Sequence, residues 1–108
     1  MSWDFGMVAD LGNGEVQVGG THNYTSNVRK MFVLALDNKE GIRCIVGMKG
    51  YTALPLLKKA YDHMQDYPST YEKLNPSNGW GDCVGAVEIL ETLIKWCEAM
   101  PEAKLRIY

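Results

Sequence analysis

The stretch WDFGMVADLGNGEVQV, residues 3–18, decides the fold. Its first nine residues alternate between apolar side chains and mostly polar or small ones, as in a strand that buries one face. The apolar positions of that face are Trp3, Phe5, Met7, Ala9 and Leu11. Gly12-Asn13-Gly14 then provides residues that tolerate the positive φ angles of a tight turn. Because the alternation resumes at Val16 and Val18, the sequence predicts a β-hairpin.

A polar segment and a first helix follow the hairpin. Gly19-Gly20 is expected to break the second strand, and residues 21–27, which are rich in turn-forming and helix-capping side chains, are expected to form a loop. Apolar residues at helical spacing then predict a helix that ends before residues 37–41. They are Val28, Met31, Phe32, Ala35 and Leu36. The short apolar run 42–46 fits either a strand or a helix.

Two more helices are expected in the middle of the chain. Thr52 is a candidate N-cap for a helix that ends near Tyr67, just before a proline. Ser69 and Glu72 have the spacing of a capping box, which predicts a short helix that ends at Leu74. The middle of the chain is therefore expected to be mostly helical.

The longest helix and a final strand complete the expected fold. The helix begins after Asp82 and ends at Pro101, and its two apolar seams predict burial on two sides. Leu105 and Ile107 alternate with polar neighbours, and the strand they predict should join the hairpin, because an isolated hairpin is only marginally stable in water. The expected fold class is α+β in the order ββααααβ. It is one domain, residues 1–108, in which three or four helices cover a single sheet.

Composition restricts the class of protein. The 108 residues include 11 basic and 13 acidic side chains, and the resulting formal charge of −2 argues against bulk nucleic-acid binding. The apolar fraction of 46% is that of a globular domain rather than of a disordered chain. The sequence contains no stretch typical of a membrane span or a signal peptide. We therefore expect a cytoplasmic protein without membrane contact.

The cysteines and histidines form no motif for a metal ion, a cofactor or a disulfide framework. Cys44, Cys83 and Cys97 are odd in number and contain no CxxC, and His22 and His63 stand far apart. No metal, cofactor or catalytic residue is therefore assigned. Cys83 falls at an expected helix N-terminus, which favours a lowered thiol pKa, whereas Cys97 lies on an apolar seam and is expected to be inert.

Two polar segments, 21–27 and 75–82, are the candidate functional site. Each precedes an expected helix N-terminus, and together they carry more hydrogen-bonding side chains than two helix caps require. We expect them to lie side by side, with Trp80 as a stacking platform between two glycines. The candidate ligand- or partner-binding residues are His22, Asn23, Thr25, Ser26, Asn27, Asn75, Asn78, Trp80 and Asp82. The alternative is that these side chains only cap helices and stabilise turns.

Four segments carry a resemblance to a known family: WDF at 3–5, NYTSNV at 23–28, ALPLL at 53–57 and NPSNGWGD at 75–82. They resemble a family of small uncharacterised proteins encoded by tailed bacteriophages. The similarity covers nearly the whole chain, although the CIV segment at 44–46 departs from the pattern. The resemblance implies a small accessory protein in the cytoplasm of an infected bacterial cell, rather than a part of the virion.

Three functions remain open. The first is a non-enzymatic host-takeover or anti-defence factor, which binds a host protein or a small nucleotide-like signalling ligand through the two polar segments. The second is a small hydrolase or transferase that acts on a nucleotide-like substrate, with Asp82 or His22 as the base. The third is a structural module that forms a homo-oligomer through exposed aromatic side chains. The first is preferred because the sequence contains no catalytic constellation.

Overall fold

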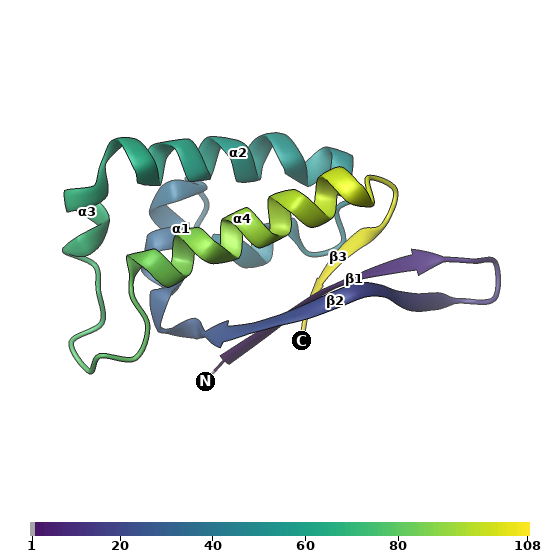
Figure 1. The fold of residues 1–108 in the computed structure, drawn as a ribbon, viewed down its shortest axis with the longest axis horizontal. Helices are drawn as coiled ribbons and strands as arrows, with labels where there is room; N and C mark the ends of the chain where they lie inside the picture. Colours follow the sequence, from purple (N-terminus) through teal and green to yellow (C-terminus); the bar gives the residue numbers. More distant parts are fainter. Residues whose placement is uncertain (1) are drawn as a thin grey trace.

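The computed structural model describes residues 2–108 and arranges them as a three-stranded sheet with helices layered on one face (Figure 1). The strands are β1 (Ser2–Asp10), β2 (Glu15–Thr25) and β3 (Lys104–Ile107). The helices are α1 (Arg29–Ala35), α2 (Gly50–Asp66), α3 (Pro68–Glu72) and α4 (Cys83–Ala99), with short 3-10 helices η1 (Ser26–Val28) and η2 (Gly41–Ile45). This order confirms the expected α+β fold.

The C-terminal strand joins the hairpin, as the sequence predicts. The sheet order is β2-β1-β3, and both pairings are antiparallel. In the centre of the sheet, Met7 lies opposite Val18 on one side and opposite Leu105 on the other. Gly12 and Gly14 have φ angles of 93° and 106°, a region that glycine enters without strain, so the tight turn of the hairpin is also confirmed.

The second strand is longer than expected, and the prediction of a loop over residues 21–27 is wrong up to residue 25. The register shifts between Phe5 and Met7 of β1, where Gly19-Gly20-Thr21 of β2 form a β-bulge. Gly19 has a φ of 70°, which suits glycine at a bulge. The two glycines therefore bend the strand without ending it, and the polar residues that follow stay in the sheet.

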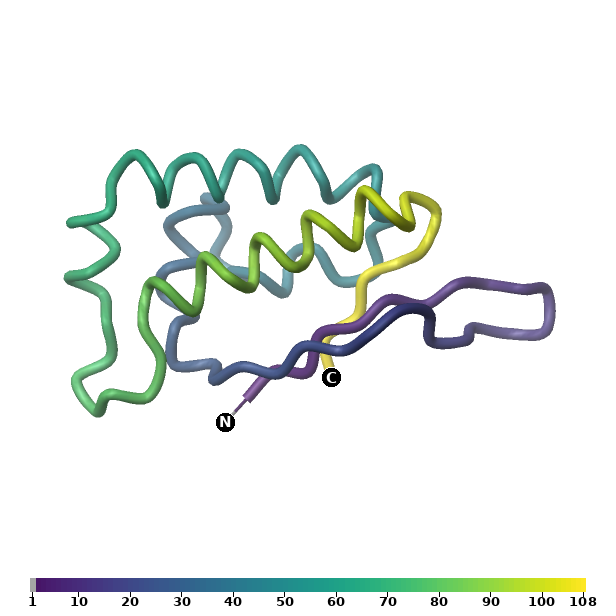
Figure 2. Tube along the Cα trace, viewed as in Figure 1, coloured from purple at the N-terminus to yellow at the C-terminus, as the bar shows by residue number. Residues whose placement is uncertain are grey.

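The helix-facing side of the hairpin is buried only in part. Trp3, Phe5 and Met7 are almost completely buried in the core, whereas Leu11, which we expected on the same buried face, is 70% exposed. The prediction for Leu11 is wrong because the end of the hairpin extends past the helical layer (Figure 2). The alternation gives the face of each side chain but not the length of hairpin that the helices cover.

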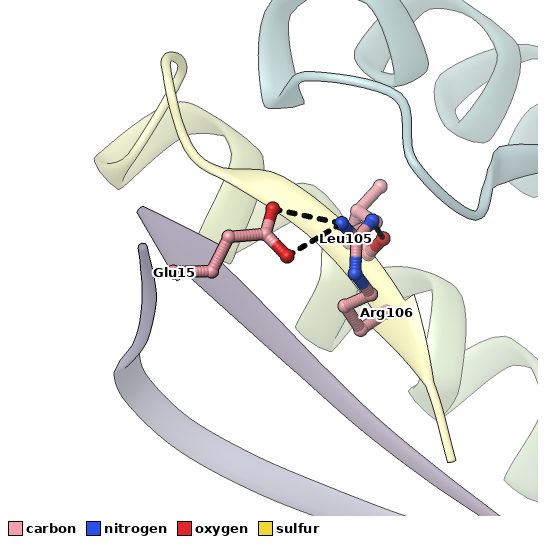
Figure 3. A network of polar contacts seen from close by, with 3 residues as sticks. All are labelled: Glu15, Leu105 and Arg106. Carbon is pink, nitrogen blue, oxygen red and sulfur yellow. Dashed lines mark hydrogen bonds and ion pairs between the residues drawn. The ribbon is translucent and has the colours of Figure 1, made fainter. Parts of the chain in front are cut away.

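No helix covers the opposite face of the sheet in residues 2–108, and this face carries an ion pair. Nη2 of Arg106 in β3 donates to both carboxylate oxygens of Glu15 in β2, at 2.9 and 2.8 Å (Figure 3). Arg106 lies opposite Gly6, and Glu15 lies opposite Asp10, so the pair crosses β1 between these positions. Val8 lies between them on β1 and is only 6% exposed. The ion pair therefore helps to cover an apolar side chain on this face.

The start of α2 differs from the sequence prediction. The helix begins at Gly50 with no side-chain cap, so the prediction of Thr52 as N-cap is wrong. The N–H of Gly50 instead donates to the carbonyl of Ala103, 2.8 Å away, just before β3. Long-range pairing with the C-terminal segment therefore sets this helix start, and a local capping signal does not reveal it. The helix ends at Asp66, as expected.

The short helices α3 and η2 also differ from the sequence prediction. The prediction of a capping box formed by Ser69 and Glu72 is wrong, because α3 begins at Pro68, before Ser69, and has no side-chain cap. The fixed φ of proline suits the first helical position. The helix ends at Glu72, two residues before the expected end at Leu74. The ambiguous run 42–46 is neither strand nor α-helix but mostly the 3-10 helix η2. Ile42 and Ile45 anchor η2 in the core.

The helix α4 is the central element of the core, as its two apolar seams predict. It packs against α2 and lies over the sheet (Figure 1). Its fully buried side chains include Ala86, Ile89, Leu90, Leu93 and Cys97. Although α4 is apolar on two sides, neither it nor any other helix within residues 2–108 has the length and apolar character needed to cross a membrane.

Candidate functional site

The end of β2 and the segment that leads into α4 lie side by side, as expected for the two polar segments. Nδ2 of Asn27 donates to the carbonyl of Trp80 at 3.4 Å. The N–H of Asp82 donates to the hydroxyl of Tyr24 at 3.1 Å. These two contacts join residues more than fifty positions apart in the sequence. The polar segments therefore form one continuous surface.

Two glycines allow this close approach. Gly81 has a φ of 92°, and a Cβ at this residue would lie 2.5 Å from Cγ2 of Thr25. A Cβ on Gly85, in the first turn of α4, would lie 2.7 Å from Cε1 of Tyr24 and even closer to its hydroxyl end. The ring of Tyr24 thus packs directly on the helix backbone. Sequence reasoning missed Tyr24, although its place opposite Trp3 in the strand pattern puts it on the helix-facing side.

A shallow hollow of about 760 Å³ lies where the segments meet, and we name it the Trp80 groove. Trp80 is 70% exposed, far more than a tryptophan that only fills the core. The groove is lined by Ser2, Asn23, Tyr24, Thr25, Asn27, Asn78, Trp80 and Gly81. Five of the nine candidate site residues are therefore found together: Asn23, Thr25, Asn27, Asn78 and Trp80.

Asn75 and Asp82 act as helix caps and do not line the Trp80 groove. Oδ1 of Asp82 accepts from the N–H of Gly85 at 2.8 Å, and Oδ1 of Asn75 accepts from the N–H of Cys83 at 2.9 Å. These side chains occupy N–H groups at the start of α4 that would otherwise attract an anion. For Asp82 the capping alternative describes the geometry, whereas Asn75 caps α4 and also lines a neighbouring hollow. The idea of an anion held by this helix N-terminus finds no support in these contacts.

Each amide side chain in the groove uses one polar atom for structural contacts and has one remaining polar atom. Nδ2 of Asn23 donates to Oδ1 of Asp4 at 2.7 Å and to the carbonyl of Trp3 at 3.1 Å. Oδ1 of Asn78 accepts from the N–H of Trp80 at 3.0 Å. Within residues 2–108, Oδ1 of Asn23, Oδ1 of Asn27 and Nδ2 of Asn78 have no hydrogen-bond partner. These exposed atoms can bind water or a ligand.

The two remaining candidates, His22 and Ser26, lie outside the groove lining. His22 is in β2, where its ring centroid is 6.5 Å from that of Phe5. Ser26 is the first residue of η1 and is half-buried. His22 shares the helix-facing side of β2 with Tyr24, because it lies opposite Phe5 as Tyr24 lies opposite Trp3.

A second hollow, of about 430 Å³, is lined by residues 73–78 together with Asn27 and Lys30, and we name it the lysine groove. It contains Lys30 and Lys73, and its lining has no carboxylate. Neither lysine forms an ion pair within residues 2–108. Asn27 and Asn78 line both grooves, so the two hollows adjoin. No sequence pattern joins these two lysines, because only the fold brings residues 30 and 73 together.

Outside the two grooves, one close polar contact links α2 with α3. Nδ1 of His63 lies 2.6 Å from the hydroxyl of Tyr71, whose pKa is raised by burial. His63 is half-buried. No group of three metal-ligating side chains occurs in the described residues 2–108.

The cysteines differ from the expectation at one position. The pKa of Cys83 is raised, mainly by burial and further by the carboxylates of Glu72 and Asp82, so the prediction of a lowered pKa is wrong. Backbone hydrogen bonds at the start of α4 oppose this effect but do not outweigh it. Burial raises the pKa of Cys97 to about 11, as expected for an inert core thiol.

Comparison with known proteins adds no further identification. No protein-family model, no curated protein and no solved structure matches this chain.

Proposed function

We propose that this chain is a small phage-encoded binding protein, not an enzyme, which holds a nucleotide-like ligand of the host cell across the Trp80 groove and the lysine groove. The observation that carries the proposal is the arrangement of the 75–80 segment. An exposed indole lines one groove and two lysines without ion pairs line the adjoining one, with Asn27 and Asn78 shared between the grooves.

This arrangement matches the parts of a nucleotide. A base can stack on the face of Trp80, as bases do on exposed aromatic side chains. The remaining amide atoms of Asn23, Asn27 and Asn78 can donate to and accept from the edge of the base. Lys30 and Lys73 provide positive charge for a phosphate, and the lysine groove has no carboxylate to repel it. The volumes of the two grooves fall in the range of small-molecule sites.

The biological setting follows from the resemblance to phage proteins. The NYTSNV and NPSNGWGD segments that carry this resemblance also supply most of the Trp80 groove. A phage protein that sequesters a host signalling nucleotide in the cytoplasm would blunt a defence response that depends on that nucleotide. A host protein is the alternative ligand, because exposed tryptophans are also common at the centre of protein interfaces.

The geometry favours binding over catalysis. Of the two candidate bases, Asp82 accepts the N–H of Gly85 as a cap, and His22 lies outside the groove lining. A general base must reach the proton that it removes, directly or through one water molecule. The small nucleotide-acting enzyme therefore remains the second candidate, and phosphate or base release from a bound nucleotide would establish it.

Calorimetric titration with a panel of nucleoside mono-, di- and triphosphates and cyclic dinucleotides tests the proposal. We expect at least one of them to bind without turnover. Trp80→Ala should weaken that binding roughly tenfold or more, since stacking on an aromatic side chain is worth about 1–3 kcal/mol per base. The double variant Lys30→Glu with Lys73→Glu should weaken it similarly.

The matched control is Lys59→Glu with Lys95→Glu, which makes the same change in charge on exposed parts of α2 and α4. It should leave binding unchanged. Equal losses in the two double variants would mean that net charge, and not the lysine groove, attracts the ligand. No binding by any member of the panel would overturn the nucleotide proposal and favour a host protein.

A further inference from the structure

The two edges of the sheet differ in how they are covered. The outer edge of β3 is paired: the N–H of Gly47 donates to the carbonyl of Leu105 at 2.8 Å, and the N–H of Leu105 donates to the carbonyl of Met48 at 2.9 Å. An isolated bridge between Lys49 and Lys104 continues this pairing. By contrast, the backbone of residues 15–23 has no hydrogen bond to any described segment other than β1. The outer edge of β2 is therefore open.

The register shows which backbone groups of β2 point to the open edge. Asp4 exchanges both of its backbone hydrogen bonds with Tyr108, so the backbone N–H and C=O groups of the even-numbered residues of β1 point toward β3. The backbone groups of the odd-numbered residues of β1 then point toward β2, where they pair with the backbone of Val16 and Val18. It follows that the N–H and C=O groups of Gln17 point outward and are available to a further strand.

This edge lacks the devices with which proteins usually protect an open strand. Charged side chains, above all lysine, and proline are the common ones. β2 contains no lysine, arginine or proline, and its single acidic residue, Glu15, is held by Arg106 on the outer face of the sheet (Figure 3). The bulge at Gly19-Gly20-Thr21 protects only the part of the strand that follows it. Residues 15–18 thus remain a regular edge whose charge is already neutralised.

The same part of the hairpin also exposes apolar surface. Leu11 is 70% and Val16 is 43% exposed, both on the helix-facing side, where the hairpin extends past the helices (Figure 1). A two-stranded ribbon with an uncovered apolar face is only marginally stable in water. An additional strand would pack beside the exposed Val16 of β2 and satisfy the open backbone groups.

We propose that a second copy of this chain pairs with the open edge, β2 against β2 in antiparallel orientation, with the twofold axis at Gln17. This pairing is self-complementary. It places Val16 of each copy beside Val18 of the other on the helix-facing side, and it places Glu15 beside Gly19, so no like charges face each other. The result is a continuous six-stranded sheet in which the two helical layers lie toward opposite ends. The dimer is independent of the nucleotide site.

The contacts near the axis fit this register. Met100, at the end of α4, lies over the helix-facing side of β2, because a Cβ on Gly19 would be 2.8 Å from its Cε. The neighbouring copy would bring its Val16 beside Val18 and Met100, which gives the exposed valine an apolar environment. The short paired segment suggests an affinity at the weak end of specific interfaces.

Sedimentation velocity at protein concentrations up to about 1 mM tests the dimer. We expect a concentration-dependent equilibrium between monomer and dimer. Gln17→Lys puts two like charges opposite each other on the axis and should raise the dissociation constant at least about tenfold. The matched control, Asn13→Lys, adds the same charge at the turn of the hairpin, outside the pairing, and should still dimerise.

Amide hydrogen exchange tests the register within the same protein. The amide of Gln17 should become protected as the concentration rises, whereas the amides of Val16 and Val18, which point to β1, should not change. A protein that stays monomeric at the highest concentration overturns the proposal. The proposal is also overturned if Gln17→Lys still dimerises and the Gln17 amide of the wild type still exchanges rapidly in the dimer.

Discussion

Gly85→Ala tests the junction of β2 and α4, on which the Trp80 groove depends. Alanine in place of glycine normally stabilises a helix by up to about 1 kcal/mol. At Gly85 the added Cβ would lie 2.7 Å from Cε1 of Tyr24, whereas ordinary Cβ contacts are 3.4–4 Å. The ring must therefore withdraw from α4, and its hydroxyl must give up the N–H of Asp82. The structure predicts a loss of stability where helix propensity predicts a gain.

The expected magnitude follows from three contributions. Overpacking a well-packed position costs about 1–3 kcal/mol. The lost hydrogen bond costs about 1 kcal/mol, and the gain in helix propensity of about 1 kcal/mol offsets that loss. The net result is a destabilisation of about 1–3 kcal/mol, which corresponds to a decrease in Tm of roughly 4–12 °C for a domain of this size.

Thermal unfolding followed by circular dichroism measures this effect, and Tyr24→Ala provides the control background. Without the tyrosine ring, the three atoms closest to the new methyl group are gone, so Gly85→Ala should there raise Tm. The change of sign between the two backgrounds is the diagnostic result. An increase in Tm in both backgrounds would refute the packing of Tyr24 on α4 and, with it, the geometry of the groove.

Three further predictions concern the core. Leu90→Ala should cost about 2–5 kcal/mol because Leu90 is fully buried, whereas Glu91→Ala should stay within about 0.5 kcal/mol in urea unfolding. Deleting residues 104–108 should lower Tm by more than about 10 °C, since it removes β3; a change within about a degree would contradict the sheet order. The folded-state pKa of Cys97 is raised from 9.0 to about 11, so its stabilising contribution is complete below pH 9 and is lost as pH rises toward 11. The stability advantage of the wild type over Cys97→Ala should therefore shrink across that interval, and a constant difference would argue against the raised pKa.

The elements that the sequence predicted correctly are those with a long or regular apolar pattern. The hairpin, the first helix, α4 and the C-terminal strand each bury regularly spaced apolar side chains in the core, and periodicity reports those positions directly. The errors lie where long-range contacts decide the local structure. Gly50 begins α2 because the preceding segment pairs with β3, and the bulge keeps residues 21–25 in a strand despite their turn-forming composition.

The candidate site was predictable only in part, because local composition identifies some of its residues and long-range contacts bring the others together. Composition identified Asn27, Asn78 and Trp80, because exposed amides and an aromatic residue beside glycines are unusual in a plain connection. It could not separate them from Asp82, because a cap and a ligand-binding group use the same side chains. The lysine groove was not predictable at all, because its two lysines come from different helical regions and meet only in the folded chain.

The most direct test of the proposed binding surface is a nuclear magnetic resonance titration of the wild-type protein with the tightest-binding nucleotide of the panel. We expect chemical-shift changes at the indole N–H of Trp80, at the side-chain amides of Asn27 and Asn78, and at the ammonium groups of Lys30 and Lys73. Changes confined to another part of the surface, or none at millimolar nucleotide, would contradict the account.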